Sequence, residues 1–182
     1  DSSRDAKRFQ YERFILSQLL VMALKGVPAF YLPALLASEN DIKSFSMTGQ
    51  RRDLNREKFK LDNLVSVLNN PESNANKNIK YLGNAMDIRS KLEQFHPSSE
   101  MECLSKGRSD IVVIKRGKGP KSVFAIHNMT ENKINYQLDD YDLPELIDND
   151  FNMKDFLAST KYNWKNISLD PFQVIWLGSL MK

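Results

Sequence analysis

The sequence predicts an α/β region followed by an all-β domain, with the change near residue 96. Two observations carry this prediction. An apolar helical segment at residues 6–25 leads through Gly26 into an unbroken apolar run at residues 27–32, which is the αβ unit of a wound α/β fold. Beyond His96-Pro97, short runs rich in β-formers alternate with turn signals, which is typical of a small antiparallel sheet or sandwich.

The apolar helix and the run after it form an incomplete unit. Residues 19–24 are apolar on every side, and a helix of this kind lies deep inside a larger body. Residues 27–32 are apolar without alternation, which suits a parallel strand covered on both faces. We expect the partner strands to lie in polypeptide outside this sequence. The alternative is that residues 27–32 join the antiparallel sheet formed later in the chain.

Two more helices and a set of strands complete the prediction. One helix covers residues 59–69, and its inward residues are Phe59, Leu61, Leu64, Val65 and Leu68. Ser73 can cap the next helix, at residues 74–94. Strands are expected at residues 101–104, 111–114, 123–128, 133–138 and 172–177, with shorter ones near Phe156 and Ile167.

Composition excludes several classes of protein. The 26 basic and 23 acidic residues give a net charge of +3, too small an excess to indicate a nucleic-acid partner. The single cysteine, Cys103, forms no intrachain disulfide and favours the cytoplasm. The apolar stretch at residues 19–37 is broken by Lys25, Gly26 and two prolines, so we expect no membrane span. The acidic stretch at residues 139–150 lacks EF-hand spacing and is expected to be a solvated loop rather than a metal site.

The segment at residues 49–56 concentrates Arg51, Arg52 and Arg56 around Asp53. A guanidinium offers a rigid fork of donors that stays charged. The cluster therefore suits a site that grips a polyhydroxylated or anionic ligand. The alternative is that Arg51 and Arg52 are solvated and Arg56 is held in a structural salt bridge.

The order of these motifs resembles the carboxy-terminal part of glycoside hydrolase family 13, the α-amylase superfamily, in its sucrose phosphorylase and glucosylglycerate phosphorylase branch. There a helix leads into the eighth barrel strand, written G-[VI]-P-x-[IVF]-Y, here Gly26–Tyr31. A small-residue segment ending in Asn-Asp follows, here residues 35–41, and then a G-R-x-I-N-R type signature, here Arg51–Arg56. Pro33-Ala34 depart from the His or Gly common in relatives, which leaves the acceptor open.

The resemblance implies a fold and an activity. The fold is the carboxy-terminal αβ portion of a (β/α)8 TIM barrel, residues 1–95, followed by a small antiparallel β-sheet or sandwich domain, residues 96–182. The activity is that of a retaining glucoside phosphorylase, a glycosyltransferase that moves a glucosyl unit from an α-glucoside, of the sucrose or glucosylglycerate type, to phosphate. The product is α-glucose 1-phosphate. No cofactor or metal is implied; inorganic phosphate is the co-substrate.

The resemblance also assigns residues. The three catalytic carboxylates of this family follow barrel strands four, five and seven, so none is expected in this chain, and the isolated chain is expected to be inactive without the missing amino-terminal part of the barrel. Arg56 is assigned to the donor subsite, where it binds the 4-hydroxyl of glucose. Arg52, Asn55 and Asp41 are further substrate-binding candidates, although Asp41 could instead cap a turn. His127 is expected to be structural.

A non-catalytic carbohydrate-binding or interaction module is the rival interpretation. In that case residues 1–95 support a β domain whose exposed aromatic residues bind the ligand; the candidates are Tyr136, Tyr162 and Trp164. The exposure of residues 14–32 separates the two interpretations. A module buries these residues within itself. A severed barrel leaves Leu19, Val21, Phe30 and Tyr31 either against a second chain or in a large apolar patch.

Overall fold

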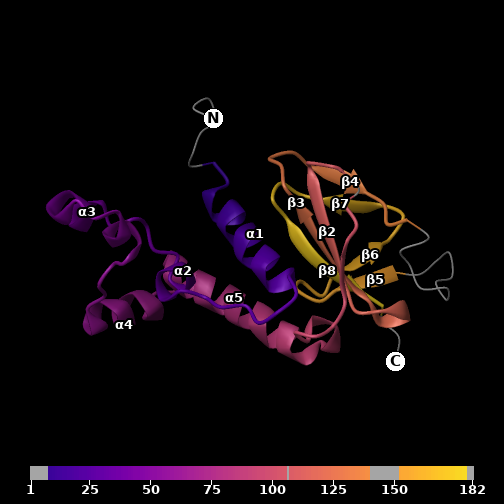
Figure 1. Ribbon diagram of the computed structural model, residues 1–182, viewed down its shortest axis with the longest axis horizontal. Coiled ribbons are helices and arrows are strands. Elements are labelled where there is room, and N and C mark those ends of the chain that lie inside the picture. The colour runs from indigo at the N-terminus through magenta and orange to yellow at the C-terminus, as the bar shows by residue number, and fades with distance from the viewer. Residues whose placement is uncertain (1–7, 106, 140–151, 180–182) are drawn as a thin grey trace. The chain divides into compact units, whose positions relative to one another are not determined.

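The computed structural model describes residues 8–105, 107–139 and 152–179 (Figure 1). The described residues group into two compact units. The first contains the chain up to Pro28 together with the chain from Ala85 onward, and the second is Ala29–Asn84. The predicted domains, residues 1–95 and 96–182, have other bounds than these two units. They stay a prediction about where the barrel ends and the β domain begins. Each unit is described by itself below.

The first unit is built on two antiparallel sheets. Six strands form one sheet in the order β1 (Met101–Cys103), β2 (Ile111–Arg116), β3 (Val123–Asn128), β8 (Val174–Gly178), β5 (Asn152–Asp155) and β6 (Lys161–Asn163). The second sheet pairs β4 (Ile134–Tyr136) with β7 (Ile167–Leu169). The antiparallel domain is therefore confirmed, and β3 has the predicted bounds. β6 was not predicted, because Lys161-Tyr162-Asn163 carries only one β-former.

The core of this unit lies inside the β domain. In the register of the central strands, Val113 pairs with Ile126, and Ile126 pairs with Ile175. These side chains are buried in one cluster with residues from the second sheet, Ile167 and Leu169. Burial of such side chains removes apolar surface from water, which is the main favourable term in folding. The β region of the sequence therefore forms its own hydrophobic core.

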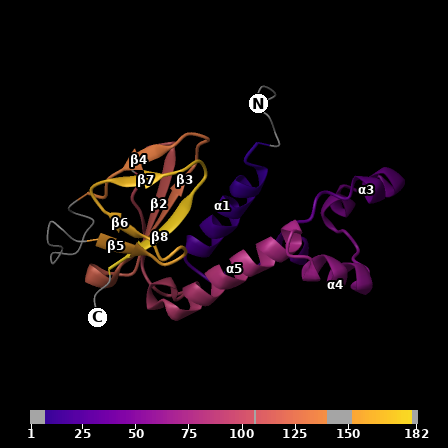
Figure 2. The same cartoon turned by 180° about the vertical axis from the view of Figure 1, so that it is seen from behind.

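Helix α1 (Gln10–Ala23) belongs to the same unit and lies beside β3 in both views (Figures 1 and 2). Leu19 and Met22 are fully buried, so one side of the apolar second half of the helix is covered. The expectation that a severed barrel would expose Leu19 is wrong, because the β domain covers it. Val21 and Leu24 remain 43% and 44% exposed.

Two arginines cap the carboxyl end of α1. Arg116 is fully buried, and its Nη1 donates to the carbonyl oxygens of Ala23 at 3.0 Å and Leu24 at 2.8 Å. Arg89 donates from Nε to the Met22 carbonyl at 2.9 Å and from Nη2 to the Gly26 carbonyl at 2.8 Å. Burial lowers the pKa of both guanidiniums. Cationic donors suit this place, because a helix leaves its last carbonyls unpaired and ends with a partial negative charge.

Gly26 therefore does not end α1 in the predicted way. A glycine directly after the helix commonly turns the chain in the left-handed conformation and satisfies the last carbonyls with backbone amides. Here the cap residue is Leu24 in an extended conformation, and Gly26 has φ 116°. The arginine donors take the place of the backbone amides, which the sequence pattern did not indicate.

The predicted strand at residues 27–32 is not formed among the described residues. Tyr31 is extended, with φ −81° and ψ 138°, and helix α2 (Leu32–Leu35) begins directly after it. The run neither pairs in parallel nor joins the antiparallel sheet in the described part of the chain. An extended segment becomes a strand only when a neighbour accepts and donates its backbone hydrogen bonds. Val27 and Tyr31 are accordingly 80% and 54% exposed.

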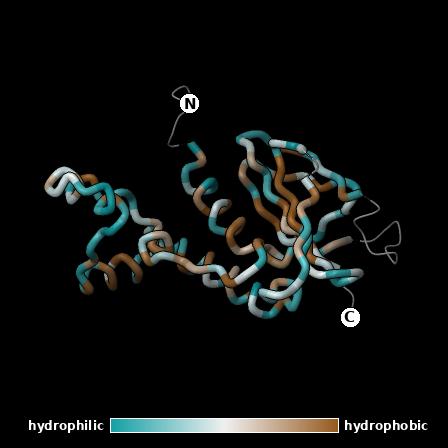
Figure 3. The backbone as a smooth tube through the Cα atoms, viewed as in Figure 1, coloured by the Kyte–Doolittle hydropathy of each residue, from teal (hydrophilic) through white to brown (hydrophobic). Residues whose placement is uncertain are grey.

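The second unit consists of short helices. They are α2, α3 (Ile42–Thr48), the 3-10 helix η1 (Arg51–Asn55), α4 (Leu61–Asn69) and the first part of α5 (Asn74–Lys91). The predicted cap is confirmed, because Ser73 Oγ accepts a hydrogen bond from the Asn76 amide at 3.1 Å. The predicted inward face of α4 is wrong for Leu61 and Val65, which are 73% and 47% exposed. Apolar residues recur along α4 (Figure 3), but no described residue covers those two.

His127 is structural, as predicted, and makes stability depend on pH. It is fully buried on β3, and burial lowers its pKa to about 4, below the ordinary value of 6.5. Between these values the unfolded chain binds more protons than the folded chain, so stability falls as the pH falls. We expect this residue to remove about 2–3 kcal/mol from the free energy of unfolding between pH 7 and pH 4.

Urea unfolding at a series of pH values checks this expectation. His127→Gln should flatten the dependence of stability on pH. The control is His96→Gln, because His96 is exposed and lies in the same unit, and it should leave the wild-type slope unchanged. Equal slopes for His127→Gln and the wild type would contradict the assignment.

Candidate functional site

The predicted substrate-binding residues lie in one segment of the second unit, residues 38–60, called here the arginine loop. It runs from the end of α2 through α3 and η1 to the start of α4. Asp41 is the N-cap of α3, and its Oδ1 accepts a hydrogen bond from the Ser44 amide at 2.9 Å. Hydrogen bonds from Ser44 hold the pKa of the Asp41 carboxyl below its ordinary value. Asp41 thus caps a turn, the structural role that was weighed for it.

The two halves of the arginine loop are tied to each other. Gly49 ends α3 in the left-handed conformation, with φ 67°, and its amide donates to the Phe45 carbonyl at 2.7 Å. The Asp41 amide donates to the Leu54 carbonyl at 2.7 Å, and the Thr48 hydroxyl donates to the Asp53 carboxylate. The chain therefore folds back on itself and brings the Asp41 backbone next to η1, which ends at Asn55.

The side chains of the three arginines in this loop lie at the surface of the second unit. Arg51, Arg52 and Arg56 are exposed, and so is Asn55. Within the described parts of the chain, none of these three guanidiniums has an ion-pair partner. The salt bridge weighed for Arg56 is therefore not formed with any described carboxylate. Its donors are available to a ligand or to a carboxylate from another stretch of polypeptide. The substrate-binding roles of Arg56, Arg52, Asn55 and Asp41 stay predictions.

A groove of about 450 Å³ lies beside the end of this loop. Its lining includes the apolar residues Leu36, Phe59 and Leu64, together with Glu57 and Lys58, which directly follow Arg56 in the chain. The groove thus adjoins the segment that carries the predicted donor-binding arginine, and both lie inside the second unit.

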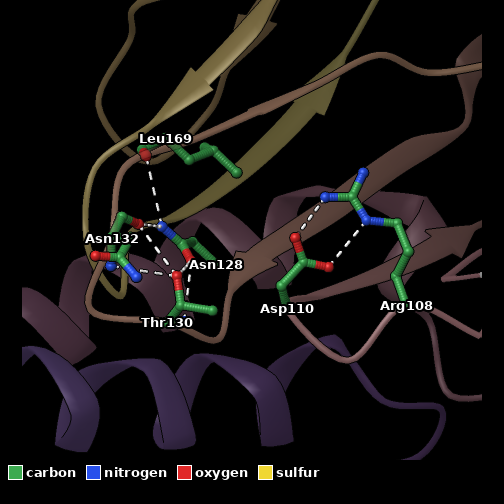
Figure 4. Close-up of polar contacts among 6 residues, drawn as sticks. All are labelled: Arg108, Asp110, Asn128, Thr130, Asn132 and Leu169. Carbon is green, nitrogen blue, oxygen red and sulfur yellow. Dashed lines mark hydrogen bonds and ion pairs between the residues drawn. The ribbon is translucent and has the colours of Figure 1, made fainter.

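The β domain has polar clusters of a different kind (Figure 4). Asn128 is fully buried, and its amide donates to the carbonyls of Asn132 at 2.7 Å and Asp170 at 2.8 Å while its oxygen accepts from the Thr130 amide at 2.9 Å. Every group there is used in holding the turn after β3. Arg108 and Asp110 form a bidentate pair on the surface, with an Nε–Oδ1 distance of 2.9 Å. These hydrogen bonds of both clusters lie within the protein and hold loops of the β domain.

The aromatic residues that a carbohydrate-binding module would need are engaged in other contacts. Trp164 is only 3% exposed and lies in the β core. Tyr162 packs against that core, and the Arg108 guanidinium lies over the Tyr136 ring at 5.6 Å from its centroid. These three aromatic residues therefore do not favour the rival interpretation. The burial of Leu19 within the chain agrees with it, whereas the exposure of Val21 and Tyr31 agrees with a severed barrel. Among all the residues that the structure describes, no group of three or more His, Cys, Asp or Glu side chains is placed so that it could hold a metal ion. The acidic stretch at residues 139–150 lies outside the described residues, apart from Asp139.

Among the helices of the described residues, none combines the length and the hydrophobicity that a membrane span requires. The stretch at residues 19–37 divides into the end of α1, a segment without helix and α2, which has Pro33 in its first turn.

Solved structures with the same arrangement define the class of fold. An α-amylase from Anoxybacillus matches 94% of this chain with a TM-score of 0.65 at 17% identity, and 33% of that enzyme is covered. A trehalose-6-phosphate hydrolase from Bacillus licheniformis matches 95% of the chain with a TM-score of 0.65 at 15% identity, and 39% of it is covered. The predicted fold class is confirmed: this is the fold of part of an α-amylase-family enzyme, with an antiparallel β domain.

Curated proteins with similar sequences are glucosylglycerate phosphorylases. The chain is 29% identical over 130 residues to a glucosylglycerate phosphorylase from Allomeiothermus silvanus, which covers 71% of the chain and 23% of that protein. It is 21% identical over 165 residues to a glucosylglycerate phosphorylase from Escherichia coli, covering 91% of the chain and 28% of that protein. The chain thus spans about a quarter of the length of these relatives. No family model matches it. The predicted resemblance to the phosphorylase branch is confirmed.

Sequence reasoning did not single out Asn76, Asn78 or Arg89. The predicted strand at residues 111–114 also ended before Arg116, which lies on β2. Their burial is the signal that distinguishes them, and the sequence gives only a hint of it. Asn78 lies four residues before the buried Leu82 on α5 and therefore shares its face.

Proposed function

We propose that the chain is the carboxy-terminal part of a retaining glucoside phosphorylase that acts on glucosylglycerate. The observation that carries the proposal is its similarity to glucosylglycerate phosphorylases, which extends over 91% of the chain in one of them. The parent enzyme transfers the glucosyl unit of the α-glucoside to phosphate and yields α-glucose 1-phosphate. It needs no cofactor, works in the cytoplasm, and takes phosphate as its co-substrate.

In this proposal the arginine loop supplies part of the donor subsite. Arg56 donates to the 4-hydroxyl of glucose and is fixed by a carboxylate from the rest of the barrel. Its exposure and its lack of an ion-pair partner among the described residues support this role. Arg52, Asn55 and Asp41 line the same region. The carboxylates that carry out the two displacement steps belong to the rest of the enzyme, which completes the site.

The exposed apolar residues support a larger parent protein. Val27, Tyr31, Leu32 and Leu61 are 80%, 54%, 49% and 73% exposed. Apolar side chains that are exposed to this degree are expected where other polypeptide packs. We propose that barrel strands from the rest of the parent protein cover these residues. They would also pair with the segment at residues 27–31 and make it a strand.

An assay of the intact protein that contains these residues tests the proposal. It is incubated with phosphate and either glucosylglycerate or sucrose, and glucose 1-phosphate is measured. We expect phosphate-dependent release of glucose 1-phosphate from glucosylglycerate at a higher kcat/KM than from sucrose. Release of free glucose alone, at a rate independent of phosphate, would mean that the enzyme is a hydrolase.

The isolated chain is the matched control for this assay. Because the catalytic carboxylates are supplied from outside these 182 residues, we expect the isolated chain to release no glucose 1-phosphate from either substrate. Turnover by the isolated chain would show that its own residues carry the chemistry, and the proposed division of the site would then be wrong.

A further inference from the structure

Two asparagine side chains on the first turns of α5 bind the ends of other helices in the second unit. Asn78 is fully buried, and its Nδ2 donates to the carbonyl oxygens of Ala34 at 3.0 Å and Leu35 at 2.8 Å. Asn76 is 9% exposed, and its Nδ2 donates to the Leu68 carbonyl at 2.5 Å. The carbonyls at a helix end have no partner within the helix, so side-chain donors can bind them.

These contacts fall at the two flanks of the arginine loop. Ala34 and Leu35 lie at the end of α2, directly before the loop, and Leu68 lies at the end of α4, the helix that directly follows it. Between the flanks, the hydrogen bond from the Asp41 amide to the Leu54 carbonyl closes the loop upon itself. The segment that carries Arg56 is therefore flanked by two side-chain contacts, and both come from the same part of α5.

The chemistry of Asn78 points to geometry rather than to stability as its role. Its Oδ1 is buried and has no hydrogen-bond partner within the described residues. A buried polar atom without a partner is unfavourable, and an apolar side chain of similar volume would fill the space without it. What the amide adds is a pair of directed bonds to consecutive carbonyls, which fix both the place and the orientation of the end of α2.

We propose that Asn76 and Asn78 are positioning residues that hold the arginine loop, and with it Arg56, in the geometry that binds the glucosyl donor. The inference rests on the proposed function. Neither residue touches substrate. Each acts through the backbone of a helix that flanks the loop, and a displacement of Arg56 by about 1 Å is enough to weaken a directed contact to the sugar severalfold or more.

The test uses the intact protein and three variants: Asn78→Ala, Asn76→Ala and the control Asn74→Ala. Asn74 lies on the same helix and is exposed. For Asn78→Ala we expect KM for glucosylglycerate to rise roughly tenfold, while KM for phosphate stays within about twofold of wild type. Asn76→Ala should show the same pattern with a smaller rise, because it removes one hydrogen bond instead of two. Asn74→Ala should match wild type.

Hydrogen exchange measured by mass spectrometry gives a readout that does not depend on activity. Peptides from residues 38–60 should exchange faster in Asn78→Ala and Asn76→Ala, while peptides from β2, β3 and β8 keep the wild-type rate. Unchanged exchange in residues 38–60, or an unchanged KM for the glucosyl donor in both variants, would overturn the proposal. Should Asn78→Ala fail to fold, Asn76→Ala alone decides between these outcomes. Wild-type protein without phosphorylase activity would refute the proposed function, whereas unchanged exchange refutes the anchoring by itself.

Discussion

Replacing Arg116 by methionine should lower the free energy of unfolding of the first unit by about 3 kcal/mol or more. The guanidinium binds the carbonyls of Ala23, Leu24 and His96 at 3.0, 2.8 and 3.0 Å, and that of Glu100 at 3.3 Å. Methionine has similar length but no donor, so buried carbonyls would lose their partners. An acceptor that is left buried without a hydrogen bond is more unfavourable than the net contribution of the bond itself.

Urea unfolding of wild type and variant measures this effect. Arg89→Met should give a smaller loss, because Arg89 makes only two such hydrogen bonds, to the carbonyls of Met22 and Gly26, and is only half-buried. The matched control is Arg51→Met, since Arg51 is exposed, and it should change stability by no more than about 0.5 kcal/mol. If Arg116→Met and Arg51→Met had the same free energy of unfolding, the hydrogen bonds from Arg116 to the end of α1 would not contribute to stability.

Arg56→Ala in the intact protein should lower kcat/KM for glucosylglycerate by roughly a hundredfold or more. A site built to bind a sugar hydroxyl loses much of its preference when the donor for that hydroxyl is removed. The same change should leave the free energy of unfolding within about 0.5 kcal/mol of wild type, because Arg56 is exposed and has no described ion-pair partner. Steady-state kinetics and urea unfolding on the same samples separate the two effects.

Two variants sharpen this prediction. Arg51→Ala removes an exposed arginine from the same loop and should keep activity within about twofold of wild type. Arg56→Lys keeps the charge but loses the planar fork of donors, so it should restore only part of the activity. Equal kcat/KM for Arg56→Ala and Arg51→Ala would end the assignment of Arg56 to the donor subsite.

The β domain was predictable because its signals are local. Alternating turn residues and β-formers placed β2, β3 and β8, and the cap at Ser73 follows from the preference of a helix start for a hydroxyl side chain. The sequence predicted a strand at residues 27–32, but the described residues form none there. A strand needs a neighbouring strand for its backbone hydrogen bonds, and the described residues supply none for this segment. The packing of Leu19 was missed because the strand beside α1 is β3, which begins at Val123, more than a hundred residues later in the chain.

The candidate site was predictable in composition and not in geometry. The sequence placed Asp41, Asn55 and Arg56 in one polar segment, and motif resemblance linked them. The backbone bond from Asp41 to Leu54 and the anchors at Asn76 and Asn78 join residues that are apart in sequence, and their partners are backbone carbonyls. Carbonyls carry no sequence signature, so contacts to them cannot be inferred from residue types.

The central claim is that the parent protein transfers glucosyl units between an α-glucoside and phosphate, and the reverse reaction tests it most directly. The intact protein is incubated with α-glucose 1-phosphate, with and without glycerate, and inorganic phosphate is measured. The proposal predicts that release of phosphate requires glycerate and is accompanied by an equal amount of α-glucosylglycerate. Phosphate release at the same rate without glycerate, or none with it, would contradict the account.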